Sequence, residues 1–360
     1  MKVTYFTPPV FKPSMEFRVV AETPLPPEMP VEAHATSALM QLLKSSTSFM
    51  NRDRGVMLRC QPAAEKMVNA LLSGAGADAL VAEFGTAVEA QRIGRHLWAQ
   101  QLRQCGALMT HCRETLPMEQ RQRLDNAQPP ILLDLTEKLP LPKEVINTLE
   151  HGISSADDFF AKLLELIELI KNGYLAGYEH IIAAYSDFFA DFNKEITANL
   201  KDWIRSVNDG KEVEFLTGRL KTALEALINK YSHPNPGSVL FPAPGKEGAS
   251  KEEADNWRKA LGLPDSCLKE NADGTYSVVM DIGPLSVMLT GLPDGHVVWD
   301  TAKFQAWQTG FNAQEERMKN MLQSFTQKYS NANSYHDNFN KTLSAHLSQY
   351  ADMLKAMLNF

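Results

Sequence analysis

Residues 304–353 read FQAWQTGFNAQEERMKNMLQSFTQKYSNANSYHDNFNKTLSAHLSQYADM. Two mainly apolar series repeat here every seven positions, three or four residues apart, in a stretch with no proline and one glycine. The first series comprises Phe304, Phe311, Met318, Phe325, Ala332, Phe339, His346 and Met353. The second comprises Trp307 or Gln308, Leu322, Tyr329, His336, Leu343, Tyr350 and Met357. This pattern is typical of a coiled-coil seam. A helix over 301–360 would be roughly 80 Å long, which predicts a rod.

A second seam lies earlier in the same chain. Over 154–205, a series spaced by seven runs beside a second apolar flank; the residues are Phe160, Ile167, Tyr174, Ile181 and Phe188, flanked by Leu164, Tyr178, Tyr185 and Phe192. The two helices can bury these faces against each other in antiparallel fashion within one chain. Pairing between two chains is the alternative. The similar lengths and a compact insert between the helices favour the intramolecular coiled coil.

The remaining sequence divides around these two helices. Seven of the twenty prolines fall before about residue 33, a Ser-Gly-Ala-Gly break lies at 73–76, and Pro129, Pro130, Pro140 and Pro142 follow. The fold class is therefore mainly α. We expect a disordered proline-rich tail at 1–35, a helical hairpin at 36–128, a linker at 129–153, coiled-coil helices at 154–205 and 301–360, and a small α+β insert at 206–300.

The insert changes character from helical to mixed. An Asn-Asp-Gly turn at 208–210 is followed by apolar and polar alternation at 212–215, which predicts a strand. We further expect helices at 217–231 and 251–261, an apolar run at 239–242 and strands at 275–281 and 295–299, together forming one small mixed layer.

Composition limits the possible functions. The 360 residues carry a net charge of −7 and no cluster of Lys and Arg interleaved with aromatics, which argues against nucleic acid as a partner. No apolar run reaches the roughly 20 residues of a membrane span, and the N-terminus shows no cleavable signal peptide. We therefore expect a protein that is soluble when made.

Motifs for catalysis are missing. The sequence contains no GxGxxG after a strand, no Walker loop, no HExxH and no GxSxG. We expect no enzyme, no cofactor and no metal site. Cys60, Cys105, Cys112 and Cys267 have no zinc-ligand spacing and are interpreted as free thiols rather than a zinc site. His336 and His346 lie in the seam and are interpreted as seam residues rather than ligands.

Several blocks resemble one known family. AKFQAWQTGFNAQEERMKNMLQSFTQKYSNANSYHDNFNKTLSAHL at 302–347, NGYLAGYEHIIAAYSDFFADF at 172–192 and LINKYSHPNPGSVLFPAPG at 227–245 are similar to type III secretion needle-tip proteins, the SipD/IpaD/BipD-like invasins. LGLPDSCLKE at 261–270 and KAMLNF at 355–360 extend the resemblance. It covers over half of the chain, from about residue 154 onward, and is looser in the hairpin.

The resemblance implies a virulence protein that is secreted through the needle and caps its distal end as a pentamer. It implies control of translocator and effector secretion, response to a host cue such as bile salts, and support of translocon assembly for host-cell invasion. The partners would be the needle subunit, the translocator proteins and other copies of the chain, with the host membrane reached only through the translocators. The hairpin would act as a self-chaperone, covering an apolar flank until a partner helix displaces it.

Three sets of residues are candidate sites. The family pattern implies a needle-subunit contact at Met353, Leu354, Met357, Leu358 and Phe360, with seam packing as the alternative. Asn331, Asn333, Ser334 and Asp337 interrupt the apolar stripe, which favours a role in coiled-coil register over partner contact. Tyr174, Tyr178 and Tyr185 are expected in the core, although a bile-salt groove would need such aromatic side chains with polar tips.

Two other function classes compete with this interpretation. A cytosolic helical chaperone or scaffold could use the same coiled coil to hold a partner helix, and it would stay in the bacterium. A pore-forming translocator would need apolar spans that the chain lacks.

Overall fold

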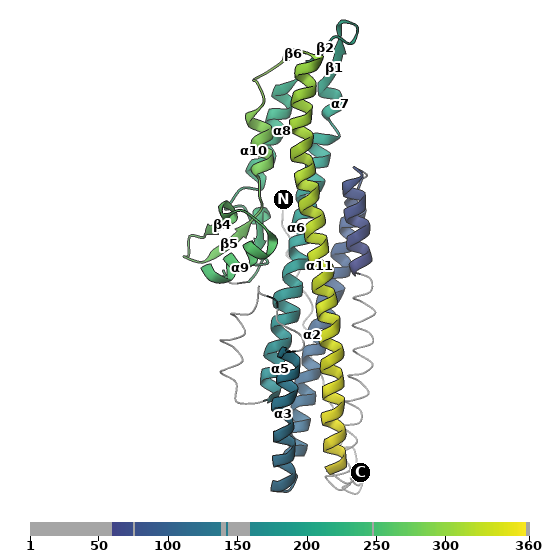
Figure 1. Ribbon diagram of the computed structural model, residues 1–360, viewed down its shortest axis with the longest axis vertical. Coiled ribbons are helices and arrows are strands. Elements are labelled where there is room, and N and C mark those ends of the chain that lie inside the picture. The colour runs from purple at the N-terminus through teal and green to yellow at the C-terminus, as the bar shows by residue number, and fades with distance from the viewer. Residues whose placement is uncertain (1–59, 75, 138–141, 143–158, 247, 358–360) are drawn as a thin grey trace, which may run out of the picture.

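The computed structural model describes residues 60–74, 76–137, 142, 159–246 and 248–357. The molecule is an elongated rod whose longest element is helix α11, Thr301–Met357 (Figure 1). Its 57 residues correspond to a length of about 85 Å. The C-terminal end of α11 lies at one end of the rod, and strands β1, β2 and β6 lie at the other (Figure 1).

Helix α11 pairs with a chain of helical segments from the same molecule. These are α5 (Phe159–Glu168), a π-helical segment (Leu169–Leu175), α6 (Ala176–Phe192), a second π-helical segment (Asn193–Thr197) and α7 (Leu200–Trp203). Four ring pairs run in opposite sequence order along the two helices: Phe192 with Phe311, Tyr185 with Phe325, Tyr174 with Tyr335 and Phe159 with Tyr350, at 5.1–6.3 Å between centroids. The predicted intramolecular antiparallel coiled coil is confirmed.

Burial follows the predicted seam of α11. The side chains buried at the predicted positions are Phe311, Met318, Leu322, Phe325, Tyr329, Ala332, His336, Phe339, Leu343 and Tyr350. Phe304, His346, Met353 and Met357 are only partly buried. The seven-residue period therefore identifies the buried face along most of the helix.

The first π-helical segment shifts the seam of the partner helix. Before it, the buried residues Phe159, Leu163, Leu166 and Ile170 follow steps of four and three. Across Leu169–Leu175 the seam takes two consecutive steps of four, from Ile170 to Tyr174 and on to Tyr178. Since a π turn accommodates one extra residue, both parts of the helix keep their apolar face toward α11.

Helices N-terminal to the coiled coil pack along its side. A helical segment at 60–72 and helix α2, Asp78–Glu114, are joined by a turn that includes Gly74 at φ +70°. The turn occurs at the predicted break. The part of the predicted hairpin at 36–59 lies outside the described residues.

Helix α3, Met118–Glu137, differs from the predicted boundary. The linker was expected to begin at residue 129, yet α3 continues through Pro129 and Pro130. Proline removes a backbone donor and disfavours the helix interior. Here Leu124 before the prolines, and Ile131 and Leu135 after them, are all buried, and this packing holds both halves in one helix.

The insert contains two separate sheets instead of the single layer expected. Strands β1 (Ile204–Val207), β2 (Glu212–Phe215) and β6 (Val297–Asp300) form an antiparallel sheet at the far end of the rod. The predicted strand at 212–215 is confirmed, but residues 204–205 belong to β1 and not to the first coiled-coil helix. The helical path ends at Trp203, where Ile204 takes extended backbone angles, and Asn208 and Asp209 take positive φ values in the turn that joins β1 to β2.

The second sheet belongs to a lobe on the side of the rod (Figure 1). It contains β3 (Val239–Phe241), β5 (Tyr276–Val279) and β4 (Leu268–Glu270), with helix α9 (Lys251–Leu261) packed against it. Helices α8 (Thr217–Lys230) and α10 (Gly283–Thr290) pack against each other, and α10 also contacts α11. The pattern in the sequence predicted α8 and α9, whereas β4 and α10 were missed.

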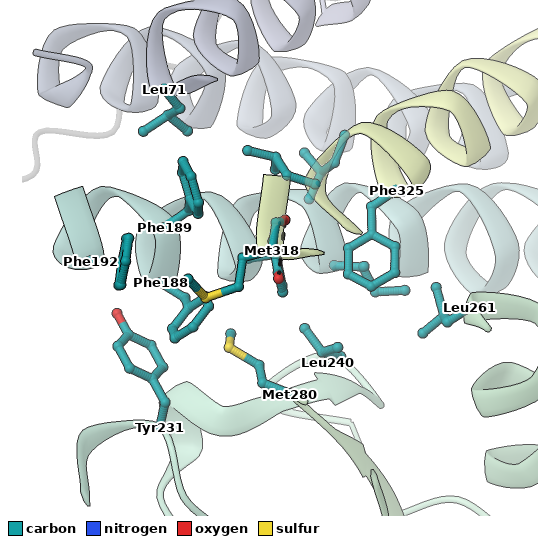
Figure 2. Packing of buried hydrophobic residues seen from close by; sticks show 14 of the residues in the cluster. Leu71, Phe188, Phe189, Phe192, Tyr231, Leu240, Leu261, Met280, Met318 and Phe325 are labelled. Atoms are coloured by element: carbon teal, nitrogen blue, oxygen red, sulfur yellow. Dashed lines mark hydrogen bonds between the residues drawn. The ribbon is translucent and has the colours of Figure 1, made fainter. Parts of the chain in front are cut away.

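One apolar core joins these parts. Leu71 from the segment 60–72 points toward Phe189 of α6, while Phe188 faces Tyr231 and Met318 lies between α6 and the insert (Figure 2). Leu240 and Met280 of the insert approach the same region (Figure 2). The insert and the first N-terminal helix are therefore built onto the coiled coil rather than attached through a separate core.

Two glycines in the long helices predict opposite effects of added side chains. A Cβ at Gly177 would lie 2.7 Å from the Trp257 ring, whereas a Cβ at the exposed Gly310 would meet no atom within 4 Å. We expect Gly177→Ala to lower the free energy of unfolding by about 1–3 kcal/mol through overpacking. Gly310→Ala should raise it by about 1 kcal/mol through helix propensity.

Urea unfolding followed by circular dichroism would measure both changes against the unsubstituted chain. The two variants serve as each other's control, because each adds one methyl group to one helix. A Gly177→Ala variant as stable as Gly310→Ala would contradict the described contact between α6 and α9.

Candidate functional site

The C-terminal end of the rod is a four-helix bundle of α2, α3, α5 and α11. Its core contains Leu102, Met109, Cys112, Leu124, Ile131, Leu135, Phe159, Leu163, Leu166, Phe339, Leu343, Tyr350, Ala351 and Leu354. Polar contacts tie α3 to α11 at its edge. The Gln128 amide donates a hydrogen bond to the Tyr350 hydroxyl at 3.1 Å, and His346 Nε2 lies 2.7 Å from Asp134 Oδ2.

The bundle separates the residues predicted to contact a needle subunit. Leu354 is fully buried in the core and is not available at the surface. Met353 and Met357 pack against that core and remain partly exposed. Leu358 and Phe360 lie outside the described residues. Of the five, Met353 and Met357 are the side chains that the structure presents at this end of the rod.

The four polar residues predicted to set register occupy different environments. Asn333 is buried, Asp337 is half-buried and forms an ion pair with Lys341 one turn later, and Asn331 and Ser334 are exposed. A buried polar side chain in a seam restricts the pairing register of the helices. Asn333 is thus the member of the set whose position suits that role.

The three tyrosines considered for a groove are buried in the coiled coil. Tyr174 and Tyr178 pack edge to face, and Trp257 of the side lobe covers both, at 6.3 and 5.1 Å between ring centroids. Tyr185 packs against Phe325, and its hydroxyl donates a weak hydrogen bond to the Met318 carbonyl oxygen at 3.4 Å. The arrangement leaves these rings in the core.

A buried ion pair connects α2 to the coiled coil. The Arg95 guanidinium donates two hydrogen bonds to the Glu179 carboxylate, Nη1 to Oε1 and Nη2 to Oε2, both at 2.7 Å. Each side chain is 2% exposed. Bidentate geometry is the strongest form of this contact, because both carboxylate oxygens are satisfied by one planar donor.

Further polar residues surround this pair. Lys171 of the π-helical segment and His336 of α11 are both buried. Burial, together with the positive charges of Lys171 and Arg95, holds the pKa of His336 well below its usual value. Burial and the negative charge of Glu179 raise the pKa of the Tyr329 hydroxyl. A polar layer therefore interrupts the apolar contact between α2, α6 and α11.

Sequence reasoning missed this layer although part of its signal was present. Lys171 occupies the seventh-position series between Leu164 and Tyr178, and Arg95 stands seven residues before Leu102 on α2. A charged residue in an apolar series marks a buried partner or a break in the seam. The period does not identify the partner, because Arg95 and Glu179 are 84 positions apart.

The sheet end of the rod carries an open pocket of about 460 Å³. Its lining includes Met288 of α10, Trp299 of β6, and Trp307, Gly310 and Phe311 of α11. Lys303 lies at its edge, with the ammonium 5.2 Å from the centre of the Trp299 ring. Trp299 and Phe311 of this lining are buried, and Trp307 is half-buried.

Three cysteines whose side chains the structure describes are poorly reactive. Cys60, Cys112 and Cys267 are free and buried. Burial raises the pKa of all three thiols, to about 12 for Cys60 and about 11 for Cys267. A thiol with a raised pKa carries little thiolate and is a poor nucleophile. Over the described ranges, no three His, Cys, Asp or Glu side chains gather as metal ligands.

No helix in the described part of the chain combines the length and the apolar character that a membrane span requires. The long helices instead bury one face against each other.

Comparison with known proteins gives a consistent result. The model of a family described as type III secretion systems tip complex components matches residues 33–358. Cell invasion protein SipD of Salmonella typhi is 43% identical over 199 residues, which are 53% of this chain and 58% of SipD. Invasin IpaD of Shigella flexneri is 38% identical over 237 residues, which are 64% of this chain and 69% of IpaD. The alignment thus spans less than two thirds of the SipD relative.

A solved structure resembles the whole rod. The pathogenicity island 1 effector protein from Chromobacterium violaceum has a TM-score of 0.59 and 29% sequence identity. The match covers 90% of this chain and 100% of that protein. The likeness extends beyond the coiled coil to most of the molecule.

The buried His336 predicts acid sensitivity. Its imidazole is neutral in the folded chain, because its pKa lies well below the ordinary value, whereas in the unfolded chain it binds a proton near pH 6.5. As the pH falls below about 6.5 the unfolded state therefore gains protons that the folded state does not. Stability should fall by up to about 1.4 kcal/mol per pH unit from this group.

Urea unfolding at pH 8, 6.5 and 5.5 would measure this dependence for the unsubstituted chain and for His336→Gln. The variant should lose less stability between pH 6.5 and 5.5. His180, whose pKa burial also lowers, provides a second variant, His180→Gln, and the double variant should show the flattest profile. An unchanged slope in His336→Gln would rule out His336 as a contributor.

Proposed function

Because this chain belongs to the family of type III secretion system tip complex components, we propose that it caps the distal end of a secretion needle. The match of the family model over residues 33–358 carries the proposal. In this role the chain is secreted, is located at the bacterial surface on the needle, and acts as a structural component rather than an enzyme. Several copies, five in our proposal, would form the tip.

We place the needle contact at the C-terminal end of α11. Met353 and Met357 are partly exposed there, and the flexible thioether side chain suits an adaptable protein contact. Leu358 and Phe360 extend the same end in sequence. Leu354 contributes by packing within the bundle, since it is fully buried.

The opposite end of the rod faces away from the needle in this arrangement. There the open pocket is lined by the buried Trp299 and the half-buried Trp307, and aromatic side chains are enriched at the centres of protein interfaces. We propose that this end engages translocator proteins, controls their release and supports translocon assembly for host-cell invasion. The host membrane is then reached through the translocators.

A host cue such as a bile salt would act on the same molecule. The groove suggested by Tyr174, Tyr178 and Tyr185 is filled in this structure, and Trp257 of the side lobe covers the first two. A ligand would therefore reach these rings only when the lobe moves away from α6. This places bile-salt binding, within the proposal, at the contact between lobe and coiled coil.

The hairpin formed by the segment 60–72 and α2 is proposed to act as a self-chaperone. Helix α2 packs along α5, α6 and α11 and covers apolar surface of the coiled coil. Exposed apolar faces invite association, so a covered face keeps the chain monomeric until it reaches the tip.

The needle contact predicts the outcome of an NMR titration. Isotope-labelled needle subunit is titrated with the full chain, with a Met353→Glu/Met357→Glu variant, and with Met118→Glu as the matched control. Met118 is 87% exposed and begins α3 at the same end of the rod, so its substitution tests an exposed methionine on a neighbouring helix. The double variant should abolish the shift perturbations because carboxylates oppose burial in an apolar contact, whereas the control should retain them.

Circular dichroism of each variant would verify that the bundle remains folded. Perturbations that persist in the double variant would move the needle contact to another surface. Loss of binding in the Met118→Glu control as well would show that the effect is not specific to α11.

A secretion assay distinguishes this proposal from the alternative of a cytosolic chaperone or scaffold. Deletion of residues 2–20 should abolish secretion of the chain into the medium while leaving its amount in the bacterium unchanged. A cytosolic scaffold would remain inside the cell with or without these residues. Secretion that continues after the deletion would show that residues 2–20 carry no export information.

A further inference from the structure

The contact between α2 and the coiled coil contains a buried ion pair, in addition to buried polar side chains of the kind that Asn333 and His336 place in the coiled coil. Between α6 and α11 the contact is built from aromatic and aliphatic rows such as Phe188, Phe192 and Phe325. On α2, the apolar residues Phe84 and Leu102 are separated by the buried polar side chains Gln91 and Arg95. The hairpin therefore binds through a surface that mixes apolar and charged contacts.

Gln91 makes this contact weaker than its area suggests. The side chain is fully buried, and neither its amide oxygen nor its amide nitrogen has a hydrogen-bond partner within the described residues. Burial of an amide without a partner is unfavourable, because the group loses its hydrogen bonds to water. In the separated state the amide would regain those hydrogen bonds.

The Arg95 and Glu179 side chains, like the Gln91 amide, would form hydrogen bonds with water if α2 separated from the coiled coil. When α2 is in place, two hydrogen bonds compensate the desolvation of both charges. When α2 leaves, both groups return to water. Two buried charges are therefore less favourable than an apolar pair of similar volume, whereas one of them left alone in the contact is strongly unfavourable.

We propose that the Arg95–Glu179 ion pair is a release latch between the hairpin and the coiled coil. It holds α2 in one register, since only one alignment brings the guanidinium to Glu179, and it keeps α2 less firmly bound than an apolar contact would. The proposal rests on the proposed self-chaperone role and assigns to it the residues that make the hairpin removable.

Hydrogen exchange of the full-length chain, read by mass spectrometry, tests the latch. The variants are Arg95→Met, Glu179→Met and the double variant Arg95→Met/Glu179→Met. Arg95→Met removes two hydrogen bonds from the buried Glu179 carboxylate, so amides of 78–114 should exchange on the order of 100-fold faster. Amides of α11 between residues 318 and 343 should keep their protection. The double variant should exchange over 78–114 as slowly as the unsubstituted chain, or more slowly.

Arg113 on the same helix provides a matched control. It forms a bidentate pair with Asp125 of α3 at 2.6 and 2.7 Å, but the two side chains are 32% and 38% exposed. Since solvent screens such a pair, Arg113→Met should change exchange over 78–114 by less than about threefold. Comparing Arg113→Met with Arg95→Met distinguishes the effect of disrupting a buried ion pair from the effect of losing an arginine side chain on α2.

Three results would overturn the proposal. Arg95→Met could leave exchange over 78–114 unchanged, the double variant could exchange as fast as Arg95→Met, or α11 could lose protection together with α2. The last result would show that hairpin and coiled coil do not separate. None of these readouts requires a needle subunit, so a chain that fails to bind the needle would refute the proposed function without affecting this test.

Discussion

The antiparallel seam between α6 and α11 is the contact on which the other parts of the molecule depend. The helical path from α5 to α7 buries aromatic and aliphatic side chains against α11 along most of its length. The insert returns the chain between the two helices, and its core continues from theirs. The N-terminal helices lie along the outside of the same pair. Loss of the seam would therefore leave none of these parts with a surface to pack on.

The seam between α6 and α11 and the contact of α2 with them differ in how readily the helices could separate in water. Apolar contact between α6 and α11 has no alternative in water, because separation would expose rows of aromatic rings. The contact of α2 contains groups that water also satisfies. The proposed self-chaperone role would use this difference between neighbouring interfaces, because the chain would cover its coiled coil at one stage and expose it at another. In that proposal the chemistry of single side chains, rather than the size of the interface, sets which helix can leave.

The parts of the fold that depend on local periodicity were predictable. Seven-residue spacing identified the buried face of α11, and alternation at Glu212–Phe215 identified β2. Features that depend on distant contacts were missed. Packing of Leu124 and Leu135 carries α3 through two prolines that alone predict a linker. The Arg95–Glu179 pair and the separation into two sheets follow from three-dimensional proximity, which no spacing in the chain records.

The continuity of α11 has a mechanical consequence. One uninterrupted helix runs from the sheet end of the rod to the four-helix bundle. Over a length of about 85 Å, a tilt of roughly 5° at one end displaces the other by roughly 7 Å. Such a displacement exceeds the rise of one helical turn. A small change of angle at one end of α11 therefore becomes a large movement at its other end.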